Sequence, residues 1–245
     1  MKKYKNGAMT QREQVIEVME GLNGAATLLK LNQTVDFSGW KAKSPYANIR
    51  RIVQDDRYFF KIKPGLWGLN THRKMLGHLI AENESTERKN QLDHYYYQGL
   101  LLEIGNMQNY QTFIPDQDKN KNFLGTTLGE VRNLEKLHSF SYQSIIDRAR
   151  MVDVIWFNKR NMPYAAFEVE HSTDFTNALS KYIALQDFNT KFYVVAGQYK
   201  KRQFEEKISR DEYLPIKYRV TFIDHEKLAS WHSHSVEVNR LGDLP

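Results

Sequence analysis

Two apolar segments joined by a short polar turn constrain the fold of this chain most strongly. The first segment, VDVIWF at residues 152–157, is almost continuously apolar, and the second is AAFEVE at residues 165–170. Between them, NKRNMP at residues 158–163 has the Asn, Pro and charged residues that are typical of turns. Two apolar strands across so short a connection predict a β-hairpin.

The segments around this hairpin predict a mixed α/β domain with a small central sheet and flanking helices. Helical spacing places Leu100, Leu101 and Ile104 on the core side of the first of these helices. The expected order is a helix over 94–110, an extended segment over 111–115, the hairpin, a helix over 173–188, a buried strand over 191–197, an amphipathic helix over 198–209 and a last strand over 218–224.

Residues 10–70 predict a separate compact unit of three helices and a β-hairpin. Thr10 is the expected N-cap of the first helix, and Ser44 followed by Pro45 is a typical start for the third. The segment TLLKLNQTV at 27–35 predicts the second helix, and RYFFKIKPGLWGLN at 57–70 predicts two short strands around a Pro-Gly turn. Three helices followed by a hairpin are the arrangement of a winged helix.

The segment WKAKSPYANIRRIVQDDRYFFKIKPGLWGL resembles the HARE-HTH family, which comprises winged helices attached to restriction enzymes and chromatin proteins. The resemblance covers about the first seventy residues. It implies that the third helix enters the major groove while the hairpin follows the DNA backbone. An alternative is a winged helix that binds protein or packs against its neighbour. The expected DNA contacts are Lys41, Lys43, Ser44, Tyr46, Arg50, Arg51, Lys61 and Lys63.

Between these two parts, residues 71–91 become steadily more polar, as expected of an exposed helix that frays into a linker. We therefore expect a winged-helix DNA-binding domain over residues 1–76 and a second, mixed α/β domain over residues 77–245. Three histidines near the C-terminus, His225, His232 and His234, have no recognised metal-binding spacing, and we expect them in a solvated polar tail.

Composition removes several kinds of chemistry. The chain has no cysteine, so disulfides, zinc fingers, iron–sulfur clusters and thiol nucleophiles are excluded. Its 35 Lys and Arg residues exceed its 29 Asp and Glu residues, which mildly favours a polyanionic partner such as nucleic acid. No segment reaches the ~20 apolar residues of a membrane span. We expect a cytoplasmic prokaryotic protein with no membrane association and no organic cofactor.

Three carboxylates converge on the predicted hairpin. Alternation along AAFEVE sends the side chains of Glu168 and Glu170 to the same face, and Asp153 lies in the partner segment among large apolar neighbours. Such acids repel one another unless a cation neutralises them, and oxygen ligands suit Mg²⁺, with Mn²⁺ as a substitute. The pattern predicts cation-dependent hydrolysis of a phosphate ester. Structural or merely exposed acids are the alternative.

The order strand-Asp, hairpin, strand-Glu-x-Glu and helix resembles the PD-(D/E)xK nucleases, over about residues 92–225. The resemblance implies that residues 77–245 are a nuclease domain. The resemblance implies that Asp153 and Glu168 are catalytic metal ligands. The lysine of the motif is replaced by Glu170, which would accept the proton of the attacking water or bind a second cation; we favour the acceptor role. Lys181 on the following helix is a candidate to restore the missing positive charge.

Further residues complete the expected site. This nuclease family often supplies another acid from its first helix, which implies that Glu103 is a catalytic metal ligand; a solvent-facing glutamate is the alternative. Arg148 and Arg150 come immediately before the predicted strand VDVIWF, which contains Asp153, and there they would contact DNA phosphates unless they form surface salt bridges.

These observations predict a Mg²⁺-dependent type II restriction endonuclease that hydrolyses phosphodiester bonds of double-stranded DNA at a specific sequence. By analogy with the family, we expect a homodimer, because one site cuts one strand. Two alternatives remain at this stage: a DNA-binding regulator or modified-DNA reader with an inactive nuclease core, and a repair or phage-defence nuclease with little sequence preference.

Overall fold

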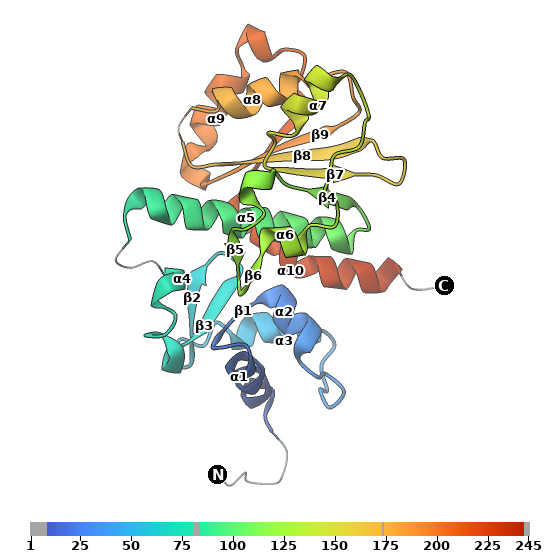
Figure 1. Cartoon of the computed structure of the whole chain (residues 1–245). Coiled ribbons are helices and arrows are strands. Elements are labelled where there is room, and N and C mark those ends of the chain that lie inside the picture. Colours follow the sequence, from blue (N-terminus) through green and yellow to red (C-terminus); the bar gives the residue numbers. More distant parts are fainter. Residues whose placement is uncertain (1–8, 81–83, 173, 243–245) are drawn as a thin grey trace. The chain divides into compact units, whose positions relative to one another are not determined.

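The computed structural model describes residues 9–80, 84–172 and 174–242. The chain divides into two compact units (Figure 1). The first comprises Met1–Glu84 together with Ser233–Pro245, and the second comprises Ser85–His232. The functional division predicted at residues 76 and 77 stays a prediction.

The first unit contains the predicted three helices and hairpin. A short additional strand, β1, pairs with β3 to give a three-stranded sheet in the order β1-β3-β2. The elements are α1 (Gln11–Gly21), β1 (Ala25–Thr27), α2 (Leu28–Thr34), α3 (Pro45–Ile52), β2 (Phe59–Lys63), β3 (Leu66–Leu69), a 3-10 turn (Asn70–His72) and α4 (Gly77–Ile80).

Capping and burial explain where these helices begin and which face they bury. Thr10 forms a capping box with Glu13 at the start of α1, and the Ser44 hydroxyl accepts the backbone N–H of Ala47 at the start of α3. On α3 and at its end, Ile49 and Val53 are fully buried. Both predicted N-caps are confirmed.

The second unit is built on a five-stranded mixed sheet in the order β10-β9-β8-β7-β4. The pairs β4/β7 and β7/β8 are antiparallel, whereas β8/β9 and β9/β10 are parallel. The predicted mixed α/β class is therefore confirmed. The strands are β4 (Gln111–Phe113), β7 (Val154–Phe157), β8 (Pro163–Glu170), β9 (Lys191–Ala196) and β10 (Val220–Asp224).

Helices cover both faces of this sheet (Figure 1). One face packs against α7 (Gln143–Ala149), α8 (Thr176–Ile183) and α9 (Lys201–Ile208), with Ala166, Phe192 and Val194 in the shared core. The long helix α5 (Thr86–Met107) lies on the other face. Short elements complete the unit: β5 (Asn122–Phe123), β6 (Thr126–Thr127) and α6 (Leu128–Val131).

Two predictions about the local structure are wrong. The polar residues 86–91 do not fray into a linker; they form the first turns of α5, because the Ser85 hydroxyl caps that helix through the backbone N–H of Arg88. The rest of that predicted linker includes residues 81–83, which lie outside the described residues.

His225, His232 and His234 do not lie in a solvated tail either, because they and the surrounding segment SWHSHS (residues 230–235) belong to helix α10 (His225–Gly242). This helix is ordered by burial: Leu228 and Ala229 are in the core, and His232 is only 1% exposed. None of the helices in the described ranges combines the length and the apolar character that a bilayer span requires.

Candidate active site

A cleft of about 480 Å³ opens in the second unit, where β7 begins and β8 ends. Its walls come from α5, the end of α7, β8 and the residue after it, α8, the 3-10 turn Asp116–Asp118 and the loop that precedes β7. Polar side chains dominate the lining, which includes Asn90, Gln91, His94, Tyr95, Gln117, Asp118, Arg148, Met151, Asp153, Glu168, Val169, Glu170, His171, Asn177 and Lys181.

The hairpin register brings Asp153 beside Glu168. Val154 pairs with Phe167, so Asp153, one residue before β7, comes opposite Glu168. The backbone N–H of Asp153 lies 3.4 Å from Oε1 of Glu168. The backbone N–H of Val169 donates to Oδ2 of Asp153 at 2.8 Å. The sequence suggested that Asp153 lies within the strand. In the structure it lies just before β7 and is held there by the backbone of the partner strand β8.

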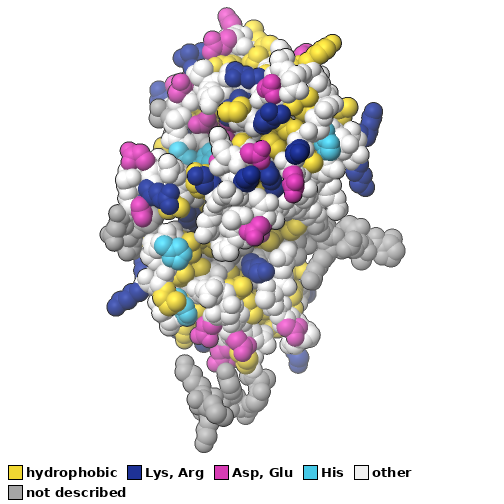
Figure 2. Space-filling model, viewed as in Figure 1, with side chains coloured by type: hydrophobic (Ala, Val, Ile, Leu, Met, Phe, Trp, Pro, Cys, Tyr) yellow, Lys and Arg dark blue, Asp and Glu magenta, His cyan; other side chains and the backbone are white. Residues whose placement is uncertain are grey.

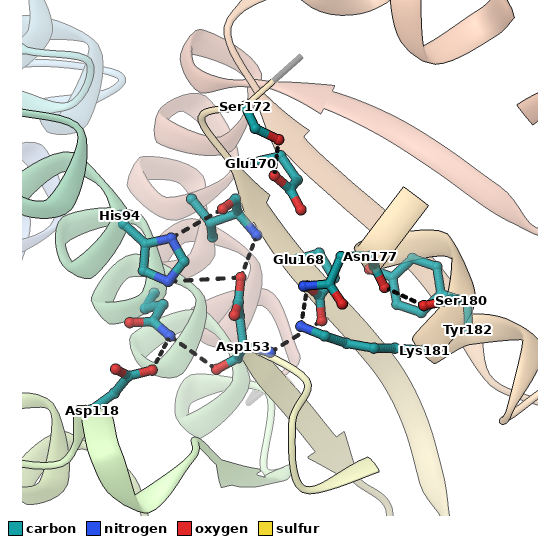
Figure 3. Close-up of polar contacts among 12 residues, drawn as sticks. His94, Asp118, Asp153, Glu168, Glu170, Ser172, Asn177, Ser180, Lys181 and Tyr182 are labelled. Atoms are coloured by element: carbon teal, nitrogen blue, oxygen red, sulfur yellow. Dashed lines mark hydrogen bonds and ion pairs between the residues drawn. The ribbon is translucent and has the colours of Figure 1, made fainter. Parts of the chain in front are cut away.

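Glu168 and Lys181 form a buried ion pair, with Nζ 2.7 Å from Oε2 and side-chain exposures of 2% and 9% (Figure 3). Burial raises the pKa of Glu168, and the negative charge of Asp153 adds to this effect, although Lys181 opposes both. Burial by itself would lower the pKa of Lys181, but the charges of Glu168 and Asp153 outweigh it, so the pKa of Lys181 is raised. Lys181 therefore remains a cation inside an acidic site.

Glu170 lies on the same face of β8 as Glu168, at the end of the strand. Its Oε2 accepts the hydroxyl of Ser172 at 3.1 Å. Burial raises the pKa of Glu170, the hydrogen bond from Ser172 opposes that rise, and the charge of Asp153 adds to it. A carboxylate with a raised pKa is better suited to accept a proton near neutral pH.

Helix α5 contributes residues that the sequence alone did not single out. Gln98 donates through Nε2 to Oδ2 of Asp118 at 3.0 Å and to the carbonyl oxygen of Asp153 at 3.2 Å. One helical turn earlier, His94 reaches Asp153 and the carbonyl of Val169 (Figure 3). Their i, i+4 spacing was the only signal available, and nothing local indicated that this face of α5 meets residues more than fifty positions away.

Glu103 lies on α5 nine residues beyond His94, about 13 Å along the helix axis. Its Oε2 lies 2.6 Å from Nε2 of His232, a buried residue of α10. Glu103 is not among the residues that line the cleft. The structure therefore does not bring this predicted metal ligand together with Asp153 and Glu168.

The two arginines before β7 differ in position. Arg148 lines the cleft, whereas the Arg150 guanidinium is exposed and lies 3.4 Å from Asp147. On the face shown in Figure 2, basic and acidic side chains are intermingled. The site of any DNA contact on this unit is thus better identified from the cleft than from overall charge.

In the first unit, the predicted DNA contacts fall into two groups. Ser44 caps α3, and the Tyr46 ring packs edge-on against Phe37 with its hydroxyl buried, so both have structural roles. The basic side chains vary from half-buried to exposed along α3 and the hairpin. Lys41, Lys43, Arg51 and Lys61 are exposed, and Arg50 and Lys63 are half-buried.

The donor atoms at the mouth of the cleft fit a divalent cation. Mg²⁺ is commonly held by one or two carboxylates and completes its shell with water and phosphate oxygens. Asp153 and Glu168 supply such a pair, and a cation would offset the repulsion that raises the pKa of Glu168. Within the described ranges, no three His, Asp or Glu side chains gather closely enough to form a ready-made metal centre.

Comparison with known proteins gives one family. The model of the type II restriction enzyme NmeDI C-terminal domain matches residues 77–235, which is well over half of the chain and includes every residue that lines the cleft. Comparisons with curated proteins and with solved structures gave no match. By this match, the chain belongs to the family of the type II restriction enzyme NmeDI C-terminal domain.

Proposed function

We propose that this protein is a Mg²⁺-dependent endonuclease that hydrolyses phosphodiester bonds of double-stranded DNA at a specific sequence. One observation supports this above the others: Asp153, Glu168 and Lys181 converge in a single cleft inside the segment that matches the restriction enzyme family. The arrangement also supports the resemblance to PD-(D/E)xK nucleases, in which two acids and a lysine perform the reaction.

In this proposal Asp153 and Glu168 hold the cation. When bound, Mg²⁺ supplies a Lewis acid for the scissile phosphate and lowers the pKa of an attacking water. The Val169 N–H keeps Asp153 oriented, and Lys181 limits the repulsion between the two carboxylates. These contacts fix both acids before substrate arrives, so little reorganisation is required at the moment of reaction.

Glu170 accepts the proton of the attacking water, in line with its raised pKa and its position at the open end of β8. Lys181 stands in for the lysine that the Glu-x-Glu sequence lacks. It comes from α8 instead of the strand, yet its ammonium group contacts the second acid directly. The ammonium group of Lys181 would stabilise the negative charge that develops on the phosphate.

DNA contacts are proposed for both units. Arg148 would bind a phosphate at the edge of the cleft, and the exposed cations of α3 and the hairpin in the first unit would give a winged-helix contact. One cleft per chain cuts one strand, so double-strand cleavage would require a homodimer whose twofold axis matches that of the target.

The proposal is tested by incubating the purified full-length protein with unmodified plasmid and phage DNA, with Mg²⁺ or with EDTA. We expect discrete fragments with Mg²⁺ and none with EDTA, and sequencing of the fragment ends would give the recognition site. A smear would instead indicate a nuclease with little sequence preference.

A regulator or modified-DNA reader is the competing function. It predicts binding without cutting across unmodified and methylated DNAs, with Mg²⁺ and with Mn²⁺. That outcome would contradict the proposal. The buried Lys181–Glu168 ion pair favours the endonuclease over this alternative, because Lys181 supplies a positive charge although the lysine of the motif is missing.

A further inference from the structure

His94 occupies a position at the mouth of the cleft that the roles proposed above do not explain. Its side chain projects from α5 toward the end of β8 and the start of β7 (Figure 3). Nδ1 lies 3.0 Å from the carbonyl oxygen of Val169, and Nε2 lies 3.7 Å from Oδ2 of Asp153. The His94 side chain is 24% exposed and that of Asp153 is 14% exposed, so both are accessible from the cleft.

The hydrogen bond to Val169 decides which ring nitrogen carries a hydrogen. A carbonyl oxygen only accepts, so Nδ1 must be the donor. In the neutral ring, Nε2 then directs a lone pair toward a carboxylate oxygen. This arrangement is favourable only with a positive charge between the two atoms, either a proton on Nε2 or a cation that both atoms bind.

The separation of the two atoms favours the cation. A charged N–H to carboxylate hydrogen bond closes to about 2.7–2.9 Å, which is much shorter than the observed 3.7 Å. Two ligand atoms that each lie about 2.1 Å from the same metal ion are roughly 3.0–4.2 Å apart, depending on the ligand–metal–ligand angle. The observed separation falls inside this range.

The surroundings of His94 are also those of a metal ligand. A metal-binding histidine commonly donates its other ring N–H to a carbonyl or carboxylate, which fixes the ring. Here the backbone of Val169 holds both candidate ligands in place. Its carbonyl oxygen accepts a hydrogen bond from His94, and its N–H donates one to Asp153. The two side chains are thus oriented by one residue of β8.

We propose that His94 is a nitrogen ligand of the cation held by Asp153 and Glu168. These three side chains do not form a ready-made metal centre in the described structure, so they would have to draw together when the cation binds. This inference rests on the proposed function, which supplies the cation. An imidazole nitrogen favours first-row transition ions over Mg²⁺ and Ca²⁺, which prefer oxygen. The site is therefore a mixed nitrogen and oxygen site that binds Mn²⁺ more tightly than a pair of carboxylates alone.

The test measures metal binding by the full-length protein without DNA. Mn²⁺ and Ca²⁺ affinities are determined by calorimetry, and pulsed electron paramagnetic resonance of bound Mn²⁺ reports any directly bonded nitrogen. We expect a nitrogen coupling in the wild type. His94→Ala should abolish it and weaken Mn²⁺ binding about tenfold, with a smaller effect on Ca²⁺.

Two further variants guard against misfolding. His94→Gln offers an oxygen in place of the nitrogen, so the coupling should vanish while Ca²⁺ binding is retained. His138→Ala removes an imidazole of the same unit that contacts Gln111 and does not line the cleft, and it should leave both the coupling and Mn²⁺ affinity unchanged.

An unchanged nitrogen coupling in His94→Ala, or an unchanged Mn²⁺ affinity, would overturn the assignment. Asp153→Ala separates this failure from that of the proposed function. If Asp153→Ala loses Mn²⁺ while His94→Ala does not, the carboxylate site stands and only the role of His94 is wrong. If Asp153→Ala binds Mn²⁺ like the wild type, or the wild type binds none, the proposed cation site itself is wrong.

Discussion

At the scale of single residues, the central feature is a buried carboxylate that has a second carboxylate beside it. The Glu168 side chain is buried and has Asp153 beside it, and both conditions raise its pKa. The Lys181 ammonium group is the nearest opposite charge, at 2.7 Å. Removing one partner of such a pair leaves an uncompensated charge, so Lys181 both supports the fold and shapes the electrostatics of the site.

Substitution of Lys181 tests this electrostatic role. Lys181→Met keeps much of the side-chain volume and removes the charge, so we expect the single-turnover rate of DNA cleavage to fall by about 10²-fold or more. Lys201→Met, which removes an exposed cation on α9 that pairs with Glu205, is the matched control and should cut normally. A Lys181→Met enzyme that is folded by thermal unfolding and cuts at the wild-type rate would contradict this role.

Two half-buried histidines near the cleft, His171 and His225, make stability depend on pH. Burial lowers the pKa of His171 and of His225 from the ordinary 6.5 to about 4. The unfolded chain therefore binds more protons than the folded one between these values, so stability is complete above pH 6.5 and declines as the pH falls toward 4. The loss is on the order of 2–3 kcal/mol for each ring.

His225→Phe should remove part of this acid sensitivity, because phenylalanine can keep the stack on Tyr97 and does not titrate. We expect urea midpoints of variant and wild type to diverge as the pH is lowered from 7.5 to 4.5, with the variant losing less. Parallel curves would show that His225 is not the group responsible.

The acids of the site could be predicted from sequence because their relation is local. Period-two alternation and a six-residue turn fix where Asp153 and Glu168 lie in a hairpin. The partners of these acids could not be predicted in the same way. His94 and Gln98 reach Asp153 across more than fifty residues, and Glu103 faces His232 because of how α5 and α10 pack, which no local pattern records.

At the scale of elements, helix α5 positions His94 beside the sheet. The close approach of α5 to β4 and β7 depends on Gly105. A Cβ on Gly105 would lie 2.5 Å from Cγ2 of Thr112 and 2.6 Å from Nε1 of Trp156, which is itself 1% exposed. Neither neighbour has room to withdraw without moving a strand. The helix can therefore pack this closely on β4 and β7 only without a side chain at residue 105.

Gly105→Ala should therefore destabilise the protein by about 1–3 kcal/mol through overpacking, even though alanine favours a helix by about 1 kcal/mol. Gly21→Ala is the control, because no atom lies within 4 Å of its added Cβ, and it should be neutral or slightly stabilising. Urea unfolding of both variants checks this expectation. An equal effect of the two substitutions would mean that α5 does not pack as closely as described.

Most helices and strands could be predicted from the periodicity of apolar residues. The elements that could not be predicted were missed for physical reasons. The strands β1, β5 and β6 have two or three residues, which is too short for alternation to be detected. Helix α10 was missed because SWHSHS looks polar, although His232, Ser233 and Ser235 are buried in the folded chain. Burial of polar residues depends on partners from other elements, so sequence patterns underestimate it.

At the scale of the whole molecule, we propose a different kind of contact with DNA for each of the two units. The cleft in residues 85–232 would hold the scissile phosphate, and the exposed cations of the first unit would add affinity through phosphates. The division of the chain is a property of the structure, whereas the DNA-binding role of the first unit remains a proposal that salt dependence can test.

Lys43→Ala and Arg51→Ala should each weaken DNA binding across different sequences and reduce the slope of log affinity against log salt by about one. The matched control is Arg57→Ala, which removes an exposed cation of the same unit that is paired with Asp55 at 2.7 Å. Fluorescence anisotropy over a salt series measures the slope. If all three variants change it equally, the contact is general attraction and not a defined winged-helix interface.

The central claim is that Asp153 and Glu168 hold the cation that hydrolyses DNA, and the most direct measurement compares cleavage with binding in Asp153→Ala and Glu168→Ala. Both variants should lose Mg²⁺-dependent cleavage, while their DNA affinity, measured without added metal, should stay close to that of the wild type. If both variants still cut DNA at the wild-type rate, the catalytic site lies elsewhere in the molecule.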